Sequence, residues 1–430
     1  MKIVRYPKRK TWSELLTRPV QEFKKIEKIV NPILKKVRRK GDKAIRKFAQ
    51  EYDHVTLSEL LVSRKEVKDA IPKVSTTLKN AIDIAIRNIE TFHEAQKDQL
   101  LEVETMPGVF CSRKSLPIPS VGLYIPGGTA PLFSTVLMLG IPANIAGCEE
   151  IIICTPTDHA GNINPAILYT ANKIGIDKII KVGGAQAIAA MAYGTESVPK
   201  VCKIFGPGNQ YVTTAKQIVS KEGIAIDMPA GPSELLVYAD DTAIPAFVAA
   251  DLLSQAEHGV DSQVVLVTTS EHILKEVPKC VLQQLQDLPR KNVAEKALAN
   301  SLAILMKNDI EAMDLINEYA PEHLILMVAS PENMAQRVKN AGSVFLGNYT
   351  PESVGDYASG TNHTLPTNGY ARAYSGVSLD SFMKKITFQH LTPAGLKALG
   401  PAVEAMAEAE HLRAHRQAVS VRLKYLENHV

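Results

Sequence analysis

Short runs of β-branched and aliphatic residues alternate with helical stretches from about residue 118 onward, and this alternation limits the possible folds more than any other feature. It is typical of parallel sheets whose strands are joined by crossover helices. Four such pairs follow one another up to residue 233: VGLYIP with LFSTVLMLGIPANIAG, EEIIICTP with NPAILYTANKIG, KIIKVGG with AQAIAAMAYG, and KVCKIFGPG with NQYVTTAKQIVSK. We expect them to form one doubly wound domain.

A second series of strands and helices begins near Glu234 with SELLVYAD and ends with SVFLG. The chain has 430 residues, and single cores rarely grow past about 250 to 300 residues, so two cores are expected. Residues 20–100 have an almost wholly helical pattern, with an N-cap at Ser75 and a proline, Pro32, that can kink a helix. Amphipathic helices need a surface to pack on, and we assign these to the second sheet.

The predicted fold class is therefore α/β, with two Rossmann-like doubly wound domains, one inserted in the other, a helical N-terminal arm and a helical C-terminal segment. The tail has no expected sheet of its own, so it should dock on another surface, such as a second subunit. The expected parts are an arm at 1–20, a discontinuous first α/β domain at 21–117 and 234–377, a second α/β domain at 118–233, and a tail at 378–430.

Lysine and arginine are concentrated in the first fifty residues, as in KKVRRKGDKAIRK, although the net charge is only +4. Apolar residues recur through this region at helical spacing, so the basic side chains are expected on the solvated face of an amphipathic helix. A basic patch without a recognisable nucleic-acid-binding motif is weak evidence for nucleic-acid binding. We expect no nucleic-acid partner. The apolar positions are Phe23, Ile26, Val30, Ile33, Leu34 and Val37.

The five cysteines are scattered along the chain and include no CxxC pair. This argues against a disulfide framework and against a zinc site made of thiolates. Apolar runs stay shorter than the roughly 18 residues that would span a bilayer, and no apolar segment follows the charged N-terminus. We expect no membrane association, and a cytoplasmic location.

Polar side chains with metal-binding or acid–base chemistry occur in four short segments. Gln255 and His258 are three residues apart near a predicted helix C-terminus, so they would share one face. A metal ion could lie between them, although a solvated histidine at a helix end is the more common arrangement for an isolated QxxH. Glu322 and His323 are adjacent in a helix-to-strand loop, where a carboxylate and an imidazole can divide general acid and base work.

Residues 350–367 form a long polar stretch that carries Glu352, Asp356 and His363. Structureless loops of this length tend to be functional or mobile. Asp356 could be a metal ligand and His363 a substrate contact; an Asx turn and a surface histidine fit the spacing equally well. In EAEHLRAHR, His411 and His415 stand at i and i+4 of an expected helix, a spacing that suits zinc but lacks the glutamate of a protease HExxH.

Three glycine-containing loops could hold phosphate groups. GPGNQY, from Gly206, follows a strand and opens a helix, but Tyr211 replaces the third small residue of a dinucleotide fingerprint. GLYIPGG at 122–128 and VGGAQ at 182–186 are similar candidates. Taken singly, each is more often a simple tight turn.

Taken together, the ordered motifs closely resemble the L-histidinol dehydrogenase family over about residues 10–425. The joint match is far more specific than any single segment. The motifs are GLYIPGG, VGGAQAIAA, FGPGNQYV, IDMPAGPSE, SQAEHG, APEHL, TPESVGDY, NHTLPT and EAEHLRAH.

The resemblance implies a role for each matching position. The family is NAD-linked, binds one zinc ion per subunit, and forms homodimers whose C-terminal segment reaches into the partner's active site. The implied residues are Gln255, His258, Asp356 and His415 as zinc ligands; Glu322 and His323 as the acid–base pair; Ser233, His363 and Glu410, with the ligand positions and His323, as contacts to L-histidinol; and Tyr124, Gln186 and Asn209 as NAD contacts.

The chain departs from the family pattern at two positions. Many members have proline where this chain has Thr361, and commonly glycine where it has His411. The first change is expected to loosen the loop that carries His363. The second offers zinc a rival ligand to His415, which we still favour because His411 lies outside the family pattern.

The implied mechanism has zinc orienting the imidazole and amino groups of L-histidinol, His323 accepting the hydroxyl proton, and Glu322 activating water for the second oxidation. Three alternatives remain at this point: a zinc hydrolase that does not use NAD, a catalytically silent protein that binds zinc and a nucleotide, and a related dehydrogenase for another amino alcohol or a sulfonate. Ser233 and Glu410 favour histidinol.

Overall fold

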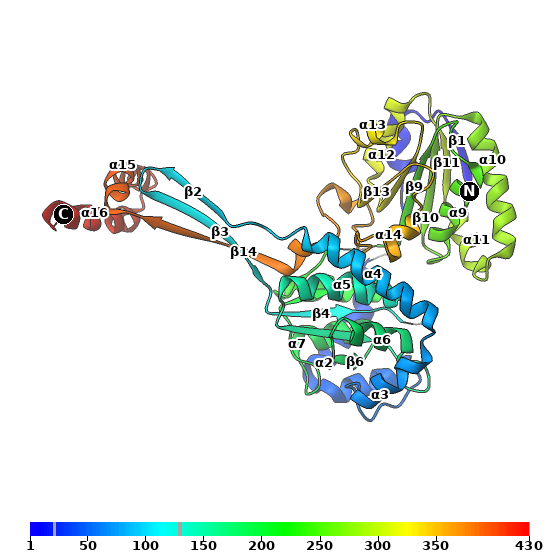
Figure 1. Cartoon of the computed structure of the whole chain (residues 1–430), viewed down its shortest axis with the longest axis horizontal. Coiled ribbons are helices and arrows are strands. Elements are labelled where there is room, and N and C mark those ends of the chain that lie inside the picture. The colour runs from blue at the N-terminus through cyan, green and yellow to red at the C-terminus, as the bar shows by residue number, and fades with distance from the viewer. Residues whose placement is uncertain (20–22, 128–130, 230, 430) are drawn as a thin grey trace. The chain divides into compact units, whose positions relative to one another are not determined.

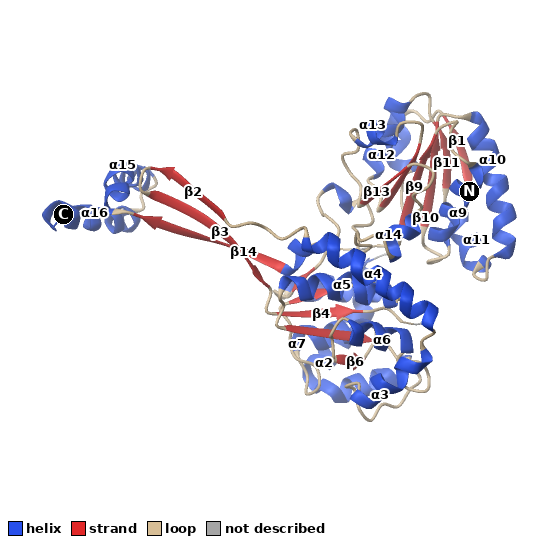
Figure 2. Cartoon of the chain, viewed as in Figure 1, coloured by secondary structure: helices blue, strands red, loops and turns tan. Residues whose placement is uncertain are grey.

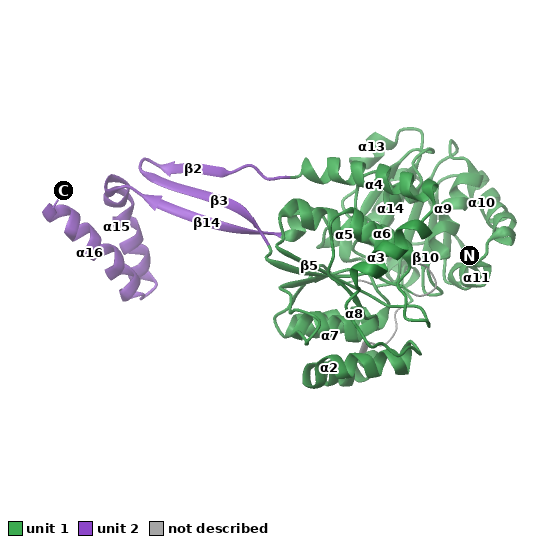
Figure 3. Cartoon of the chain, turned by 60° about the horizontal axis from the view of Figure 1, so that its bottom comes forward, with its two compact units in different colours: residues 1–96, 118–382 green, residues 97–117, 383–430 purple. Residues whose placement is uncertain are grey.

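The computed structural model describes residues 1–19, 23–127, 131–229 and 231–429. It divides into two compact units, shown in different colours in Figure 3. Unit 1 comprises residues 1–96 and 118–382, and unit 2 comprises residues 97–117 and 383–430. Unit 1 contains two parallel sheets with helices, and unit 2 contains a small antiparallel sheet and two helices (Figures 1 and 2).

The first sheet of unit 1 has six parallel strands in the order β1-β11-β10-β9-β12-β13. Its four central strands, β9 to β12, are rich in Val, Ile and Leu because both of their faces are buried. They span Lys2–Arg5 (β1), Glu234–Ala239 (β9), Gln263–Thr268 (β10), Leu302–Leu305 (β11), His323–Met327 (β12) and Ser343–Leu346 (β13).

Helices cover both faces of this sheet, because successive side chains of a strand point to opposite sides. Leu235 and Val237 pack in a core with three helices, α9 to α11. Leu236 and Tyr238 pack in a second core with α1 and α12. The doubly wound prediction is confirmed. The helices of this half are α1 (Trp12–Leu15), α9 (Pro245–Ala256), α10 (Glu271–Gln284), α11 (Lys291–Ala299), α12 (Asp309–Tyr319), α13 (Pro331–Ala335) and α14 (Glu352–Tyr357), with short 3-10 turns at Arg9–Thr11, Leu285–Asp287 and Tyr370–Arg372. A further 3-10 turn, Leu379–Phe382, packs against the helix at Phe133–Ala146 of the other half.

The second sheet has five parallel strands in the order β6-β5-β4-β7-β8 and lies between β1 and β9 in the sequence, so one α/β half is inserted in the other. Its strands span Ser120–Tyr124 (β4), Glu150–Thr155 (β5), Ile179–Lys181 (β6), Lys203–Phe205 (β7) and Ala225–Ile226 (β8). Its crossover helices span Phe133–Ala146 (α5), Pro165–Lys173 (α6), Gly184–Tyr193 (α7) and Gln210–Lys221 (α8).

The helices that precede this sheet in the sequence pack on it, and our assignment of them to the other sheet was wrong. Helix α2 (Phe23–Tyr52) packs against α7 and α8, α3 (Arg64–Ala70) against α6, and α4 (Thr76–Glu94) against α5. Ser75 caps α4 as predicted, and a 3-10 turn at Ile71–Lys73 joins α3 to α4. Amphipathicity shows that a helix must bury one face, but it does not identify the partner.

Among the described residues, we find no helix with the length and apolar character that a membrane span requires.

Helix α2 bends at Gly41 rather than at Pro32. Gly41 has φ 49° and ψ −134°, whereas the helix continues through Pro32. Glycine reaches this backbone region without the steric cost that a Cβ would add. The kink that Pro32 could have caused therefore occurs at Gly41.

The carboxyl ends of β4 and β7 form the switch point of the five-stranded sheet, because the strand order runs outward from them in both directions. Ligands of open α/β sheets usually bind in such a crevice. Tyr124 ends β4 and Gly206 directly follows β7, so two of the expected cofactor loops lie at this point. In contrast, Glu322 and His323 lie at the amino end of β12.

Unit 2 contains a three-stranded antiparallel sheet in the order β14-β3-β2. Our prediction of a tail without a sheet was wrong, because residues 383–391 form a strand that pairs with β3. Residues 97–117, which we placed in the first α/β domain, supply the other two strands. The elements of unit 2 are β2 (Leu101–Met106), β3 (Val109–Pro117), β14 (Met383–Leu391), α15 (Pro393–Ala409) and α16 (Arg413–His429).

His411 lies in the turn between α15 and α16, so it does not share a helical face with His415, as the HxxxH spacing suggested. Its φ is +60°, in the left-handed region that ends many helices. Glycine is the residue best suited to that conformation. The rival-ligand arrangement on one helix is therefore wrong, and the turn explains why a glycine would fit this position.

Replacing His411 by glycine should stabilise the α15–α16 pair. A non-glycine residue in the left-handed region costs roughly 1–2 kcal/mol, part of which glycine returns through its greater freedom in the unfolded chain. We expect a net gain of about 0.5–1 kcal/mol, measured by slower hydrogen exchange of the α16 amides. Ala418→Gly, in the middle of α16, should have the opposite effect. Faster exchange in His411→Gly would contradict this account.

Candidate active site

Glu322 and His323 form a buried pair at the amino end of β12, with exposed fractions of 6% and 3%. Helix α12 ends at Tyr319, and Ala320 adopts a left-handed conformation with φ 52°. Pro321 then leads into the pair. The end of α12 and the start of β12 thus fix the backbone positions of Glu322 and His323.

The main chain of Glu234, the first residue of the neighbouring strand β9, contacts both members of the pair. Its N–H donates to Oε2 of Glu322 at 2.8 Å. Its carbonyl oxygen lies 3.2 Å from Nδ1 of His323 and can only accept, so Nδ1 is the donor. In the neutral imidazole, Nε2 then has the free lone pair. Nε2 is therefore the atom of His323 that can take up or release a proton.

Three side chains with ligand atoms for a metal ion lie together beside this pair. The ligand atoms of His258, Glu352 and Asp356 are all within 4.8 Å of one another. Oδ1 of Asp356 is 3.3 Å from Nε2 of His323. The expected ligands His258 and Asp356 are thus brought together next to the acid–base pair.

Gln255 lies at the end of α9 and is 1% exposed. Its Nε2 is 3.5 Å from Oε2 of Glu322, to which it donates. This contact sets the orientation of the amide and leaves its carbonyl oxygen available as a ligand. His258 lies two residues after the end of the helix. Its main-chain N–H donates to the main-chain carbonyl oxygen of Gln255 at 3.2 Å.

Glu352 is a member of this cluster to which our reading of the sequence gave no role. We expected residues 350–367 to form a structureless loop, but they contain helix α14, which carries Glu352 and Asp356 at i and i+4. That spacing places two carboxylates on one helical face, and it could have identified Glu352 if the short helix had been recognised. Glu352 is 1% exposed.

The ionisable groups of the cluster strongly affect one another. Burial raises the pKa of Glu322 and of Glu352 to about 8. Burial lowers the pKa of His323, but the negative charges of Glu352, Glu322 and Asp356 outweigh it and hold that pKa well above the usual value. Burial raises the pKa of Asp356, but the approach of His323 outweighs it and lowers that pKa overall. Three carboxyl groups, those of Glu352, Glu322 and Asp356, thus surround the single imidazole of His323.

These residues fit a divalent cation. Oε2 of Glu352 is buried and has no hydrogen-bond partner among the described residues. Buried carboxylates are costly unless they are paired with a cation or coordinate a metal ion. Imidazole nitrogen and carboxylate oxygen together are a donor set that suits zinc.

A cavity of about 1140 Å³ adjoins the pair and is lined by Ser233, His258, Glu322 and His363 among others. Three of the expected substrate contacts of unit 1, Ser233, His258 and His363, therefore line one cavity. His363 is held from two sides: Nδ1 is 2.9 Å from the Asp356 carbonyl oxygen, and Nε2 is 3.2 Å from Oγ1 of Thr135. These contacts fix its ring although Thr361 stands at the position where we expected a looser loop.

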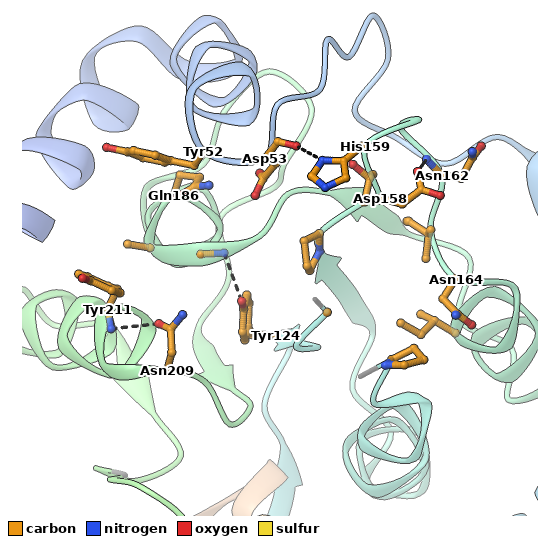
Figure 4. Close-up of a pocket in the computed structure, with 18 of the residues that line it drawn as sticks. Tyr52, Asp53, Tyr124, Asp158, His159, Asn162, Asn164, Gln186, Asn209 and Tyr211 are labelled. Atoms are coloured by element: carbon orange, nitrogen blue, oxygen red, sulfur yellow. Dashed lines mark hydrogen bonds between the residues drawn. The ribbon is translucent and has the colours of Figure 1, made fainter. Parts of the chain in front are cut away.

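A second cavity, of about 1090 Å³, lies at the switch point of the five-stranded sheet and is lined by all three expected NAD contacts. Figure 4 shows Tyr124, Gln186 and Asn209 around it. Asn209 also lines the cavity beside the acid–base pair. A long ligand that occupies both cavities would therefore pass Asn209.

The glycine loops around this cavity leave little room for side chains. A Cβ at Gly206, where φ is +127°, would clash with the Tyr124 carbonyl oxygen, and one at Gly127 would lie 2.5 Å from Pro156. Asn209 caps helix α8 by accepting from the N–H groups of Tyr211 and Val212. Glycine at these positions lets the loops after β4, β5 and β7 approach one another beside the N-terminus of α8, where a phosphate group can bind. Gly128, the last residue of the GLYIPGG candidate, lies outside the described residues.

Comparison with known proteins identifies the family. A family model described as histidinol dehydrogenase matches residues 16–423. The chain belongs to the histidinol dehydrogenase family. The histidinol dehydrogenase of Bacteroides thetaiotaomicron is 60% identical over 427 residues, covering 99% of this chain and all of that protein. The chloroplastic histidinol dehydrogenase of Arabidopsis thaliana is 53% identical over 416 residues, covering 96% and 89%.

A crystal structure of histidinol dehydrogenase from Elizabethkingia anophelis has the same fold, with a TM-score of 0.97 at 56% identity and 99% coverage of both chains. Membership of the histidinol dehydrogenase family makes the chain an oxidoreductase. The resemblance read from the nine motifs is thereby confirmed. The roles of individual residues stay predictions.

Two of the positions expected from the histidinol dehydrogenase family lie in unit 2. Glu410 directly follows α15 and His415 lies in the first turn of α16. Both side chains are exposed. The other expected positions all lie in unit 1. Most of them line one of the two cavities described above or belong to the metal cluster. Gln255 and His323 instead contact Glu322 and Asp356, respectively.

Proposed function

We propose that the chain oxidises L-histidinol through L-histidinaldehyde to L-histidine, the final steps of histidine biosynthesis, with NAD and one zinc ion per subunit. The observation that carries this proposal is the placement of Glu322 and His323 against the His258–Glu352–Asp356 cluster, at a cavity that shares Asn209 with a dinucleotide-sized cavity. Membership of the histidinol dehydrogenase family supports the substrate.

Gln255, His258 and Asp356 would hold zinc from unit 1, and His415 of a second subunit would complete the set. Zinc, when bound, would orient the substrate as a Lewis acid, since four protein ligands leave little room for a catalytic water. The exposed Glu410 and His415 are available to a neighbouring molecule, which supports a homodimer with shared active sites.

His323 would act in the first oxidation. Its Nδ1 is engaged by the Glu234 carbonyl oxygen, so Nε2 faces the cluster and would accept the hydroxyl proton of the alcohol. Ser233 and His363 line the cavity in which the substrate would lie, and Glu410 of the partner would add a third contact. The aldehyde would stay bound for the next step.

Glu322 would act in the second oxidation. Its Oε2 is held by the Glu234 N–H, and its carboxylate would take a proton from water as the water adds to the aldehyde carbon. The product of that addition is the anion of the hydrate, which again has a hydrogen on carbon to lose as hydride. NAD, bound by Tyr124, Gln186 and Asn209, would accept one hydride in each oxidation.

The experiment that tests this function is a count of NADH formed per molecule of substrate consumed. Zinc-loaded protein titrated with L-histidinol in the absence of oxygen should form two NADH per histidinol, with histidine as product. One NADH per histidinol would show that the reaction stops at the aldehyde. No NADH, or turnover of an amide or ester without NAD, would refute the proposal.

Substituting Gln186 should weaken NAD binding selectively. Gln186 is 4% exposed and lines the cofactor cavity, but not the cavity beside the acid–base pair. Loss of one hydrogen bond costs about 0.5–1.5 kcal/mol, so we expect KM for NAD to rise roughly 2- to 10-fold in Gln186→Ala. KM for histidinol and the zinc content should not change. Equal increases in both KM values would contradict the assignment.

A further inference from the structure

Arg18 and Glu234 form a buried ion pair directly behind the acid–base pair. Nε of Arg18 donates to Oε1 of Glu234 at 2.6 Å, and Nη2 donates to Oε2 at 2.8 Å. The Arg18 side chain is 14% exposed and the Glu234 side chain 3%. Two parallel hydrogen bonds fix the orientation of a carboxylate as well as its distance. Neither residue is among the described residues that line the substrate cavity.

Glu234 is the residue whose main chain contacts both Glu322 and His323. Its carboxylate also accepts from the N–H of Asn368 at 2.7 Å. A shift of the Glu234 peptide would therefore move a hydrogen-bond partner of each catalytic candidate at once. Such a residue controls the relative position of the two side chains.

Arg18 is attached to the other segment that carries the pair. Its Nη2 donates to the Tyr319 carbonyl oxygen at 2.7 Å, and its guanidinium lies over the Tyr319 ring, 3.9 Å from the centroid. Only Ala320 and Pro321 separate Tyr319 from Glu322. The Tyr319 hydroxyl donates to Gln263 at 2.8 Å, and Gln263 pairs with Glu234 in the sheet. The contacts form a closed ring around the base of the site.

We propose that Arg18 and Glu234 are positioning residues: they hold the start of β9 and the turn before β12 at the separation that directs Glu322 and His323 into the substrate cavity. This inference rests on the proposed roles of Glu322 and His323. An ion pair that served stability alone would not need to touch both segments that carry the reacting groups. Arg18 thereby gives the N-terminal segment a part in the reaction.

The test is the effect of Arg18 variants on kcat and KM of zinc-loaded, folded protein. A displacement of about 1 Å can cost roughly 10²-fold in rate, so we expect kcat of Arg18→Ala to fall about 10²-fold. KM for histidinol should change by less than about threefold and the zinc content not at all, because the ligands are untouched. Arg18→Lys keeps the charge but loses the two-pronged contact, and it should have an intermediate kcat. Guanidinium ion added to Arg18→Ala should restore part of the rate.

Two variants control for stability and for charge. Val265→Ala removes buried volume from the same sheet without touching the ring of contacts, so it should lower stability but leave kcat within about twofold. Arg38→Ala breaks an exposed ion pair with Glu222, whose side chains are 62% and 42% exposed, and should leave kcat unchanged. If Arg18→Ala does not fold, Arg18→Lys decides between the outcomes.

An unchanged kcat in folded Arg18→Ala, or in Arg18→Lys where only that variant folds, would overturn the inference. The inference would also be overturned if kcat fell as far in Val265→Ala as in the Arg18 variant. Glu322→Gln and His323→Ala, measured alongside, separate the positioning role of Arg18 and Glu234 from the proposed catalytic roles of Glu322 and His323. If these two variants lose activity and the Arg18 variants do not, only the positioning role is refuted; if they keep activity, the proposed catalytic roles are refuted with it.

Discussion

Glu322→Gln should reduce oxidation of histidinaldehyde by about 10²- to 10⁴-fold and oxidation of histidinol far less, since positioned acid–base groups contribute factors of that size. Glutamine keeps an oxygen that can accept from the Glu234 N–H, so the local structure should persist. It cannot accept a proton from water. The measurement is the rate of NADH formation with the aldehyde and with the alcohol as separate substrates.

His323→Ala provides the contrast, because loss of the Nε2 base should slow both oxidations. Glu332→Gln, the same change on an exposed residue of α13, should leave both rates unchanged. Equal losses in both oxidations for Glu322→Gln would contradict the division of work between the two residues. The two catalytic candidates would then have to share one role.

His258→Ala should remove most of the bound metal and, with it, the activity. Residues that merely support a ligand contribute about 10- to 100-fold to metal affinity, so loss of a direct ligand should cost at least about 100-fold. After dialysis, zinc measured by mass spectrometry should fall well below one ion per subunit. Activity should return in part when excess zinc is added.

His272→Ala is the matched control, since His272 is an exposed histidine on α10 of the same domain. It should keep wild-type zinc content and rate. If His258→Ala retains its zinc but loses activity, His258 touches the substrate and not the metal ion. The ligand assignment would then be wrong.

The two sheets could be predicted from the sequence because their strands are buried on both faces. Runs such as EIIICT and ELLVYA are almost continuously apolar, which is typical of parallel strands between layers of helices. Tertiary partners were less predictable. The apolar stripe of α2 is equally compatible with either sheet, and it packs on the five-stranded one. The pattern indicates that a face is buried but not what buries it.

The catalytic candidates could be predicted only through the joint family resemblance, because each motif alone has a common structural explanation. Arg18 and Glu352 were missed for a different reason. Arg18 is distant in sequence from Glu234 and Tyr319, and only the folded chain brings them together. Glu352 became apparent once α14 placed it beside Asp356. Contacts between distant segments leave no local periodicity to detect.

Strand β1 has a consequence for how shortened forms of this chain would behave. It pairs with β11 along its whole length at one edge of the six-stranded sheet. The main-chain N–H groups of Lys2 and Tyr6 donate to the carbonyl oxygens of Ser301 and Leu305. Without it, the backbone of the apolar strand β11 would be an open edge, and open edges recruit strands from other molecules. N-terminal truncation should therefore cause aggregation through β11, and purification tags should leave residues 2–6 free to pair.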